Sequence, residues 1–469
     1  SIFPRITSSF SCSIYGYTNK RFADHILQNF RYFKSISQME YIPILVLVIS
    51  FIGLLAIGTP VAWSITISAL LTMLVSIPAL PAFTTVAQRI GTGLDSFALL
   101  AIPFFILSGE LMNKGGIAHR LIAFAKTLVG ALPGGLALIN IISAMLMGAI
   151  AGSAMASASA MGSILGPEME KEGYSREFGA AVNITSATTG LLIPPSNVLI
   201  VYSLASGGAS IAALFLAGYI PGILTGLLLM LVASFWARKK GYKVGKRSTF
   251  KNILKTFIDA IPSLFMLVVV IGGIVTGIFT ATEASAIAVL YSVVLSFIYK
   301  EITFEKLPQI LLDSSSTTAI VMLLIGASMS MSWALSFENI PQDISTGLLS
   351  ISDNKIIILL IINLLLLFVG IFMDMTPAVL IFTPIFLPIV MKLGLDPVHF
   401  GIIMILNLCI GVCTPPVGSV LFVGVGIANT TIEKVIKPLL PLFVVMILAL
   451  FLITYFPQLS LWLPGLFDL

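Results

Sequence analysis

Charged residues are scarce in this chain. They make up 10% of its 469 residues, whereas hydrophobic residues make up 58%, and the mean hydropathy is +1.08. This composition excludes an ordinary soluble domain and is typical of a polytopic helical membrane protein. The apolar runs are continuous and about 20 residues long, without the apolar–polar alternation of membrane-barrel strands. The sequence therefore predicts an all-α polytopic membrane protein.

Reactive and metal-binding residues are also few. The three cysteines (Cys12, Cys409 and Cys413) argue against a disulfide framework, and Cys409 and Cys413 are predicted to be small apolar fillers. The three histidines are not grouped for a metal, and no HExxH, GxSxG or nucleotide-binding motif is present. The basic residues lie in short loops between apolar runs. We therefore expect no enzyme activity, no nucleotide cofactor and no nucleic-acid partner.

What the sequence does contain is a pair of helix-breaking stretches inside apolar runs. The first runs from Gly190 through Pro194-Pro195 to Asn197, and the second from Gly411 through Pro415-Pro416 to Gly418, 221 residues later. A double proline cannot continue a helix, because two backbone donors are lost and the ring clashes with the preceding turn. In hydrocarbon the freed carbonyls must bind protein, water or an ion. Such paired interruptions indicate the binding site of a secondary transporter.

Other matches at the same spacing predict two repeats. Repeat 1 covers residues 39–237, a basic cytoplasmic loop covers 238–257, and repeat 2 covers 258–460. The polar and aromatic residues 1–38 are predicted to be an N-terminal extension or fusion linker. Each repeat is expected to contain scaffold helices, an amphipathic arm, a re-entrant hairpin, a broken helix and a final span. In repeat 1 these are scaffold 39–113 (spans 41–58, 60–80 and 95–113), arm 114–131, hairpin 134–170, broken helix 178–205 and helix 211–237. In repeat 2 they are spans 258–278, 282–299 and 313–336, arm 338–353, hairpin 356–393, broken helix 400–428 and span 434–457.

The distribution of Lys and Arg favours an inverted second repeat. If the hairpins do not cross the membrane, each half crosses five times, and 17 Lys/Arg fall on the cytoplasmic side, three outside and five in residues 1–38. If both hairpins crossed, the second half would be parallel and the arm 338–353, which has no Lys or Arg, would be cytoplasmic. We therefore predict two inverted repeats with a periplasmic C-terminus.

Polar residues near the breaks are the candidate functional residues. The stretch 148–160 is rich in Ser, Ala and Gly, which indicates either close helix packing or a hairpin tip that coordinates an ion. Backbone and hydroxyl oxygens suit Na⁺ better than a transition metal. Asp374 is expected either to bind an ion and gate or to make a structural hydrogen bond. Asn197 is expected either to contact substrate or to cap the distal half-helix. Two acidic residues are expected to be interfacial and one to stabilise a helix N-terminus: Asp95, Glu110 and Glu283, respectively.

Together, the small-residue hairpin 152–160, the break from Gly190 to Asn197 and the break at Thr414-Pro415-Pro416 resemble the large membrane subunit (M) of TRAP (tripartite ATP-independent periplasmic) transporters. The resemblance covers about residues 39–460. It implies an elevator-type transporter of the ion-transporter superfamily, with two or more coupling Na⁺ ions. Na⁺ site 1 would use Ser153, Ser157 and the Gly190 and Ile193 carbonyls, site 2 would use Gly370, Gly411, Thr414 and the Val417 carbonyl, and substrate would meet Ser196, Asn197 and Asp374.

The resemblance also implies partners and a location. A four-helix small membrane subunit (Q type) would embrace the scaffold, and a periplasmic substrate-binding protein (P type) would deliver the organic anion. The chain would be a multi-pass protein of the bacterial inner membrane, surrounded by lipid. In some members the small subunit is fused ahead of the large one, which would make residues 1–38 a linker.

Na⁺-coupled uptake of an organic acid is the function that these features favour, with sialic acid first and a C4-dicarboxylate next. The alternative is a stand-alone Na⁺/dicarboxylate symporter of the related superfamily, which needs no binding protein. A third class is a channel or a respiratory antiporter module. The antiporter module is disfavoured because it would carry Lys and Glu in mid-helix, and this chain has no apolar run with a Lys at its centre.

Overall fold

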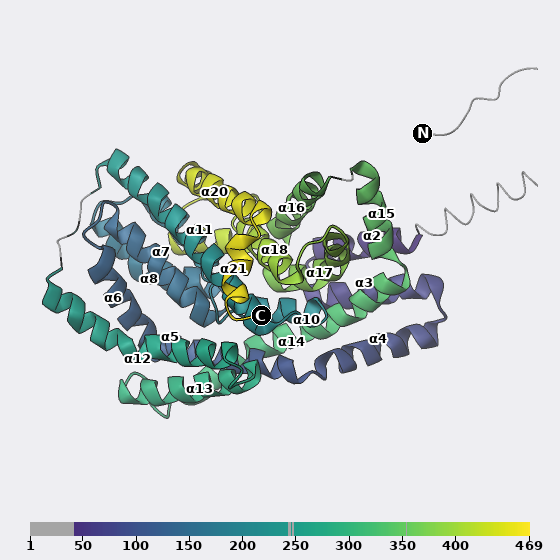
Figure 1. Cartoon of the computed structure of the whole chain (residues 1–469), viewed down its shortest axis with the longest axis horizontal. Helices are drawn as coiled ribbons and strands as arrows, with labels where there is room; N and C mark the ends of the chain where they lie inside the picture. The colour runs from purple at the N-terminus through teal and green to yellow at the C-terminus, as the bar shows by residue number, and fades with distance from the viewer. Residues whose placement is uncertain (1–41, 243–244, 246–247, 353) are drawn as a thin grey trace, which may run out of the picture.

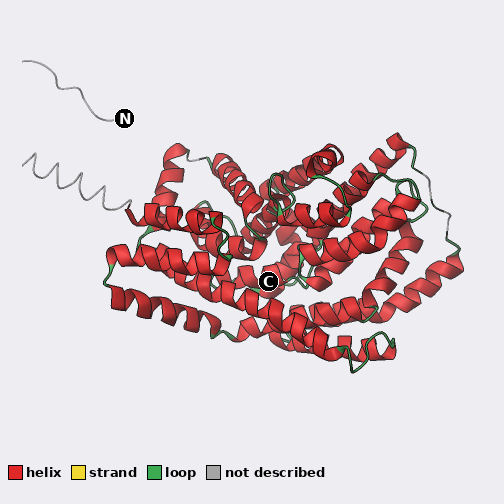
Figure 2. Cartoon of the chain, turned by 180° about the vertical axis from the view of Figure 1, so that it is seen from behind, coloured by secondary structure: helices red, strands yellow, loops and turns green. Residues whose placement is uncertain are grey.

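The computed structural model describes residues 42–469 except 243–244, 246–247 and 353, so the predicted extension 1–38 lies outside it. Throughout the described part the regular structure is helical (Figure 2), which confirms the predicted all-α fold. Within that part, eight helices are long and apolar enough to cross a membrane. The chain is therefore a multi-pass membrane protein.

Repeat 1 contains the predicted order of elements. Its hairpin consists of α7 and α8, which are separated only by Gly152 and Ser153. Gly152 adopts the left-handed conformation (φ +61°) that ends α7, and Ser153 caps α8. Its broken helix consists of α9 and α10. The helices are α2 (Ile42–Ala56), α3 (Val61–Ser76), α4 (Ala79–Leu94), η1 (Phe97–Leu100), α5 (Ala101–Lys114), α6 (Ile117–Val129), α7 (Gly135–Ala151), α8 (Ala154–Lys171), α9 (Arg176–Thr189), α10 (Asn197–Ala205) and α11 (Ile211–Lys240).

Repeat 2 follows the same order, with α16 and α17 as hairpin and α18 and α19 as broken helix. Glu283 lies in the first turn of α13 and forms a capping box with Thr280, which confirms its predicted place at a helix N-terminus. The helices are α12 (Phe250–Val275), α13 (Ala281–Ile298), α14 (Leu307–Phe337), α15 (Ile340–Ile351), α16 (Lys355–Phe372), α17 (Met375–Lys392), α18 (Pro397–Gly411), α19 (Ser419–Ile427), α20 (Ile432–Tyr455) and α21 (Gln458–Gly465).

Two features differ from the sequence prediction. Helix α4 fills the gap between the predicted spans 60–80 and 95–113, where no helix was expected, because its apolar residues form one face only and its mean hydropathy is low. The basic segment 238–257 is largely helical, since α11 continues to Lys240 and α12 begins at Phe250. Lys and Arg favour helix, so charged ends extend the helices beyond the apolar runs.

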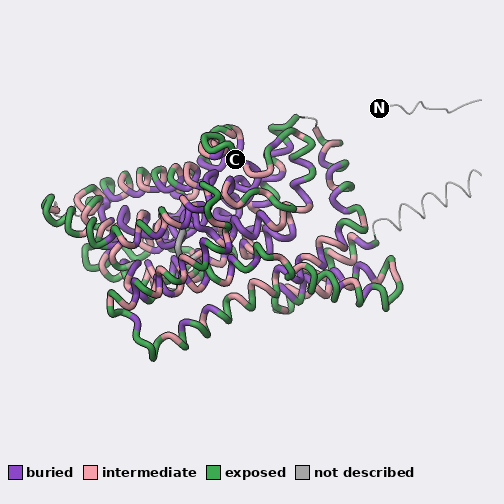
Figure 3. Tube along the Cα trace, turned by 60° about the horizontal axis from the view of Figure 1, so that its bottom comes forward, coloured by how far each residue is buried: buried purple, intermediate pink, exposed green. Residues whose placement is uncertain are grey.

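The two repeats exchange elements (Figure 1). Hairpin 1 (α7 and α8) lies on the left of this view and hairpin 2 (α16 and α17) on the right. The distal half of each broken helix packs against the hairpin of the other repeat: α10 contacts α17, and α19 contacts α8. The scaffold pairs α5 with α13 and α3 with α14. Buried residues are densest in the middle of the molecule, around the broken helices (Figure 3).

Helix length does not decide whether the hairpins re-enter. Helices α16 and α17 have 18 residues each, and 18 residues of helix span about 27 Å, close to the hydrocarbon thickness of about 30 Å. The re-entrant hairpins, the inverted membrane orientation and the periplasmic C-terminus therefore remain predictions.

Candidate functional site

Both breaks are held by a close crossing of two glycines. A Cβ built on Gly190 at the end of α9 would lie 2.5 Å from the Cα of Gly148 on α7. In repeat 2, a Cβ built on Gly411 would lie 2.5 Å from the Cα of Gly370 on α16. Only glycine permits backbones to approach so closely. The predicted site residues Gly190, Gly370 and Gly411 therefore join each hairpin to its own broken helix.

The helices that follow each break and each hairpin tip begin at corresponding residues. Ser153 is the N-cap of α8 and Asp374 the N-cap of α17, 221 residues later. Ser196 is the N-cap of α10 and Gly418 the N-cap of α19. Both Pro-Pro bonds in the breaks are cis. The duplication inferred from the proline spacing thus extends to the ends of the helices.

A central cavity of about 290 Å³ lies between the two hairpin tips and the scaffold. Predicted residues Ser153, Asn197 and Asp374 all line it, although they come from three different elements. Asn197 does not cap α10; its side chain lies against the backbone of Gly152 at the tip of hairpin 1. The scaffold wall comes from α5 and α14: Ile102, Ile106, Glu110, Thr317, Ile320, Val321 and Leu324.

The charge of this cavity is unusual for a binding site. Its lining includes two carboxylates, Glu110 and Asp374, and no Lys or Arg among the described residues. Three helices, α8, α10 and α17, begin at its wall, so their N-terminal partial positive charges are directed to this region. Glu110 was expected to be interfacial, but it faces the cavity from α5 and lies 3.9 Å from Lys114.

The predicted residues of Na⁺ site 1 differ in their hydrogen bonding. The Ser153 hydroxyl accepts from the Ala156 amide at 3.3 Å, as an N-cap does. The Ser157 hydroxyl is fully buried and has no hydrogen-bond partner within the described part of the chain. Ser196 is in the same condition, and Ile193 lies half-buried between them in sequence and structure of break 1. A buried oxygen without a partner is expensive, so each one requires an explanation.

The predicted residues of Na⁺ site 2 are more accessible. The Thr414 hydroxyl donates to the Ile410 carbonyl at 2.7 Å, which leaves its lone pairs free. Val417 is 38% exposed, whereas Ser196 at the corresponding position of break 1 is fully buried. Asp374 accepts from the Ser419 hydroxyl at 3.4 Å, so its structural hydrogen bond exists alongside its place in the cavity. The two breaks are therefore alike in backbone and unlike in access.

Sequence reasoning missed a pair of buried amide contacts. The Ser186 hydroxyl on α9 donates to Asn140 Oδ1 on α7 at 3.3 Å. In repeat 2, Asn407 Nδ2 donates to Asn363 Oδ1 at 2.7 Å, and Asn363 Nδ2 donates to the Thr454 hydroxyl at 3.2 Å. An asparagine within an apolar run at matching places of both repeats is the signal that could have found them.

The cysteines pack as predicted. Cys409 and Cys413 are free and fully buried on α18, with their thiols against α9. Their sulfur atoms lie 3.3 Å from the Thr188 carbonyl and 3.4 Å from the Ile184 carbonyl, respectively. They are small fillers between the two broken helices.

Comparison with known proteins adds independent findings. Residues 48–459 match the family described as tripartite ATP-independent periplasmic transporter, DctM component. The chain is 57% identical over 429 residues to the uncharacterized protein YgiK of Salmonella typhimurium, covering 91% of this chain and 99% of that protein. It is 41% identical to the isethionate TRAP transporter permease protein DctMQ of Oleidesulfovibrio alaskensis (91% and 67% covered). It is 38% identical to the sialic acid TRAP transporter large permease protein SiaM of Vibrio cholerae (90% and 98% covered).

Further relatives are named as large permease proteins for C4-dicarboxylates and for 2,3-diketo-L-gulonate. Among solved structures, the chain is similar to the YdaH transporter of Alcanivorax borkumensis, with a TM-score of 0.60, 14% identity, and coverage of 82% of this chain and 90% of that one. At that identity the likeness concerns the fold alone.

Proposed function

This chain belongs to the tripartite ATP-independent periplasmic transporter family as a DctM component, and we propose that it couples a Na⁺ gradient to uptake of an organic anion. Membership makes it a transporter permease rather than an enzyme. The family implies a small membrane subunit and a periplasmic binding protein as partners. The proposed location is the bacterial inner membrane, with the C-terminus on the periplasmic side.

The observation that carries this proposal is the charge of the central cavity. An organic anion would meet the carboxylates of Glu110 and Asp374 there, without a Lys or Arg among the described lining residues to balance them. Helix N-termini supply only about half an elementary charge each. Bound cations are therefore needed to make the site attractive to an anion. Neutral hydroxyl and carbonyl oxygens near both breaks are the ligands that hard cations prefer.

Each proposed Na⁺ site combines one hairpin tip with one break. Site 1 comprises the Ser153 and Ser157 hydroxyls and the Gly190 and Ile193 carbonyls, and a bound ion would give the buried Ser157 oxygen a partner. Site 2 comprises Gly370, Gly411, Thr414 and the Val417 carbonyl. Substrate lies between them and contacts Ser196, Asn197 and Asp374, of which Asn197 and Asp374 line the cavity.

Transport in this proposal is an elevator motion. The hairpins and broken helices move together against the scaffold helices α3, α5, α13 and α14. The close glycine crossings support this division, because they couple each hairpin rigidly to its broken helix. The cavity lies at the boundary, with one wall from each group.

The substrate class is an organic acid. Relatives of 41% and 38% identity are named for a sulfonate and for sialic acid, so identity does not rank these substrates. We retain sialic acid as the first substrate to test and C4-dicarboxylates as the second. Specificity would be set mainly by the binding protein.

Uptake of labelled sialic acid into proteoliposomes tests the proposal. The chain is reconstituted with and without its small subunit and binding protein, under an inward Na⁺ gradient and under a matched K⁺ gradient. Uptake that requires Na⁺ and both partners is the expected result. Uptake by the chain alone would instead support a stand-alone Na⁺/dicarboxylate symporter, and uptake without Na⁺ would refute the coupling.

A further inference from the structure

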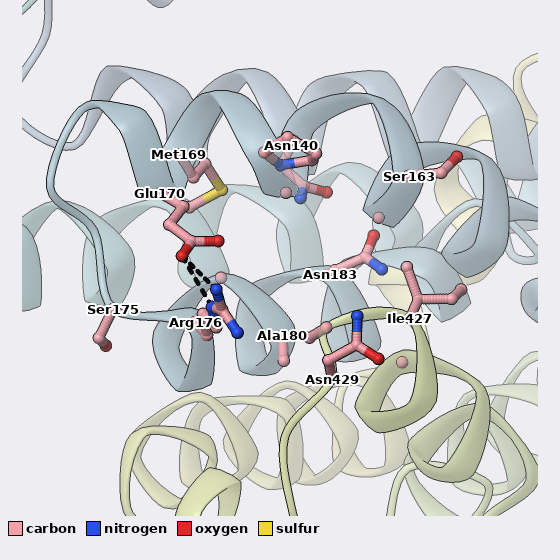
Figure 4. Close-up of a pocket in the computed structure, with 16 residues that line it drawn as sticks. Asn140, Ser163, Met169, Glu170, Ser175, Arg176, Ala180, Asn183, Ile427 and Asn429 are labelled. Atoms are coloured by element: carbon pink, nitrogen blue, oxygen red, sulfur yellow. Dashed lines mark hydrogen bonds and ion pairs between the residues drawn. The ribbon is translucent and has the colours of Figure 1, made fainter.

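A second cavity, of about 260 Å³, lies away from the central one, on the opposite side of hairpin 1. It is enclosed by α8, α9 and the C-terminal end of α19 (Figure 4). Three amide side chains from different elements, Asn140, Asn183 and Asn429, project toward it (Figure 4). The ion pair of Glu170 and Arg176 lies at its exposed end, with the guanidinium 2.5 Å from the carboxylate. The charge distribution of the chain assigns that end to the cytoplasm.

The inner end of this cavity reaches toward proposed Na⁺ site 1. Asn183 is 2% exposed; its Nδ2 donates to the Ala158 carbonyl at 2.7 Å, while its Oδ1 has no hydrogen-bond partner in the described structure. Ser157, whose hydroxyl is equally buried and unpartnered, precedes Ala158 on α8. Two unpartnered oxygens thus stand one after the other between the cavity and the tip of hairpin 1.

Polar side chains also continue along α9 from the cavity to the break. Asn183, Ser186 and Thr189 recur at every third residue, and Gly190 follows directly. The Ser186 hydroxyl bonds Asn140 Oδ1, and the Thr189 hydroxyl donates to the Ser186 carbonyl at 2.6 Å. Seven residues of helix cover about 10 Å, so this row bridges the distance from the cavity to the Gly190 carbonyl.

Repeat 2 fills the equivalent space. At the spacing of 221 residues, Gly162 corresponds to Thr383, Gly166 to Leu387, Ser157 to Ala378 and Asn183 to Met404. Thr383, Leu387 and Met404 are buried, and the Thr383 hydroxyl lies 3.3 Å from the Met404 sulfur. A duplicated fold does not require a cavity here, so its presence in repeat 1 has another cause.

From this geometry we propose that the cavity is a hydrated side path by which a monovalent cation passes between the cytoplasmic face and Na⁺ site 1 without entering the central cavity. The proposal rests on the Na⁺ coupling proposed above. The amide oxygens replace part of the hydration shell of the ion, and the ladder of hydroxyls on α9 leads it to the break. The neutral walls avoid trapping the ion.

Gly166 provides the test, because a Cβ at this lining position would meet no atom within 4 Å. The probe is Gly166→Cys in a Cys12→Ser background; Cys409 and Cys413 are fully buried and are retained. A membrane-impermeant, cationic methanethiosulfonate reagent is applied to inverted and to right-side-out vesicles. The modified complete transporter, with small subunit and binding protein, is then assayed for uptake and for stabilisation by Na⁺ against heat. The control is Glu177→Cys, in the first turn of α9 and outside the cavity lining.

The expected result is modification of Gly166→Cys in inverted vesicles only. Modification is expected to lower the initial uptake rate at least fivefold, to leave the Na⁺ concentration for half-maximal heat stabilisation within twofold, and to be reversed by dithiothreitol. Modified Glu177→Cys is expected to lose less than twofold. Gly166→Leu, which imports the residue of repeat 2, is expected to slow uptake similarly.

Three results would overturn the side path: no reaction from the cytoplasmic side, reaction without slower uptake, or slower uptake with loss of the Na⁺ stabilisation. Failure of the Na⁺ coupling is recognised separately. In that case unmodified Gly166→Cys and the parent chain would both take up substrate equally in Na⁺ and in K⁺.

Discussion

The glycine crossing at break 1 gives the most stringent prediction, since neither backbone has a flexible neighbour to move. In Gly190→Ala the new methyl group would lie 2.5 Å from the Gly148 Cα and 2.7 Å from the Ala144 carbonyl oxygen. Ordinary contacts are about 3.5–4.0 Å, so α7 and α9 must separate by about 1 Å. Overpacking of this kind costs about 1–3 kcal/mol.

That cost falls on ion binding if the proposed site 1 is correct. The Na⁺-free protein can relieve the strain by separating the helices, but the bound ion requires the Gly190 carbonyl in place. The strain energy is then subtracted from Na⁺ binding, and about 1–3 kcal/mol corresponds to roughly a 5- to 150-fold weaker affinity. We expect Gly148→Ala to act in the same direction.

The assay is heat stabilisation of the purified transporter as a function of Na⁺ concentration. Gly272→Ala on α12 is the matched control, because a Cβ there meets nothing within 4 Å. Alanine in a helix is favoured over glycine by about 1 kcal/mol, so this control is expected to be neutral or stabilising. If Gly190→Ala changes the Na⁺ midpoint no more than Gly272→Ala does, the reasoning from the crossing is wrong.

Three further predictions concern polar groups. Ser157→Ala removes a buried hydroxyl without a partner, so we expect it to leave the Na⁺-free protein equally or more heat-stable but to weaken Na⁺ stabilisation about tenfold; a loss of stability without Na⁺ would contradict this. Asn363→Leu leaves Asn407 unpartnered and is expected to cost about 1–3 kcal/mol, whereas Asn363→Leu/Asn407→Leu is expected to recover part of it, measured as the midpoint of heat unfolding; additive losses would refute the pair. Asp374→Asn keeps the shape but removes a cavity charge, so we expect the Na⁺ midpoint of uptake to rise about tenfold; an unchanged midpoint would reduce Asp374 to its hydrogen bond with Ser419.

The elements that sequence reasoning located are those defined by backbone restrictions. Pro194-Pro195 and Pro415-Pro416 cannot lie within a helix, and the spacing between them predicted where the second set of elements would fall. Hydrophobicity over about 20 residues located most spans for a similarly simple reason, the thickness of the bilayer. Helix α4 escaped because only one of its faces is apolar.

The parts that sequence reasoning could not supply depend on which residues meet in space. Glu110 was assigned to an interface by its place near a helix end, but the packing of α5 directs it into the central cavity. Gly162 and Gly166 read as ordinary small residues until the structure shows what they leave empty. Comparison of the two repeats position by position could have found them, because Thr383 and Leu387 occupy the same places in repeat 2.

The exchange of half-helices between repeats has a consequence for how the chain is made. Helix α8 finds its partner α19 only after roughly 250 further residues have been synthesised, which takes about 12–50 s at 5–20 residues per second. During that interval the polar wall of hairpin 1 has no cover from repeat 2. The first half of the newly made chain must therefore wait in the membrane as an incomplete unit, and neither half, made alone, contains everything that its own hairpin packs against.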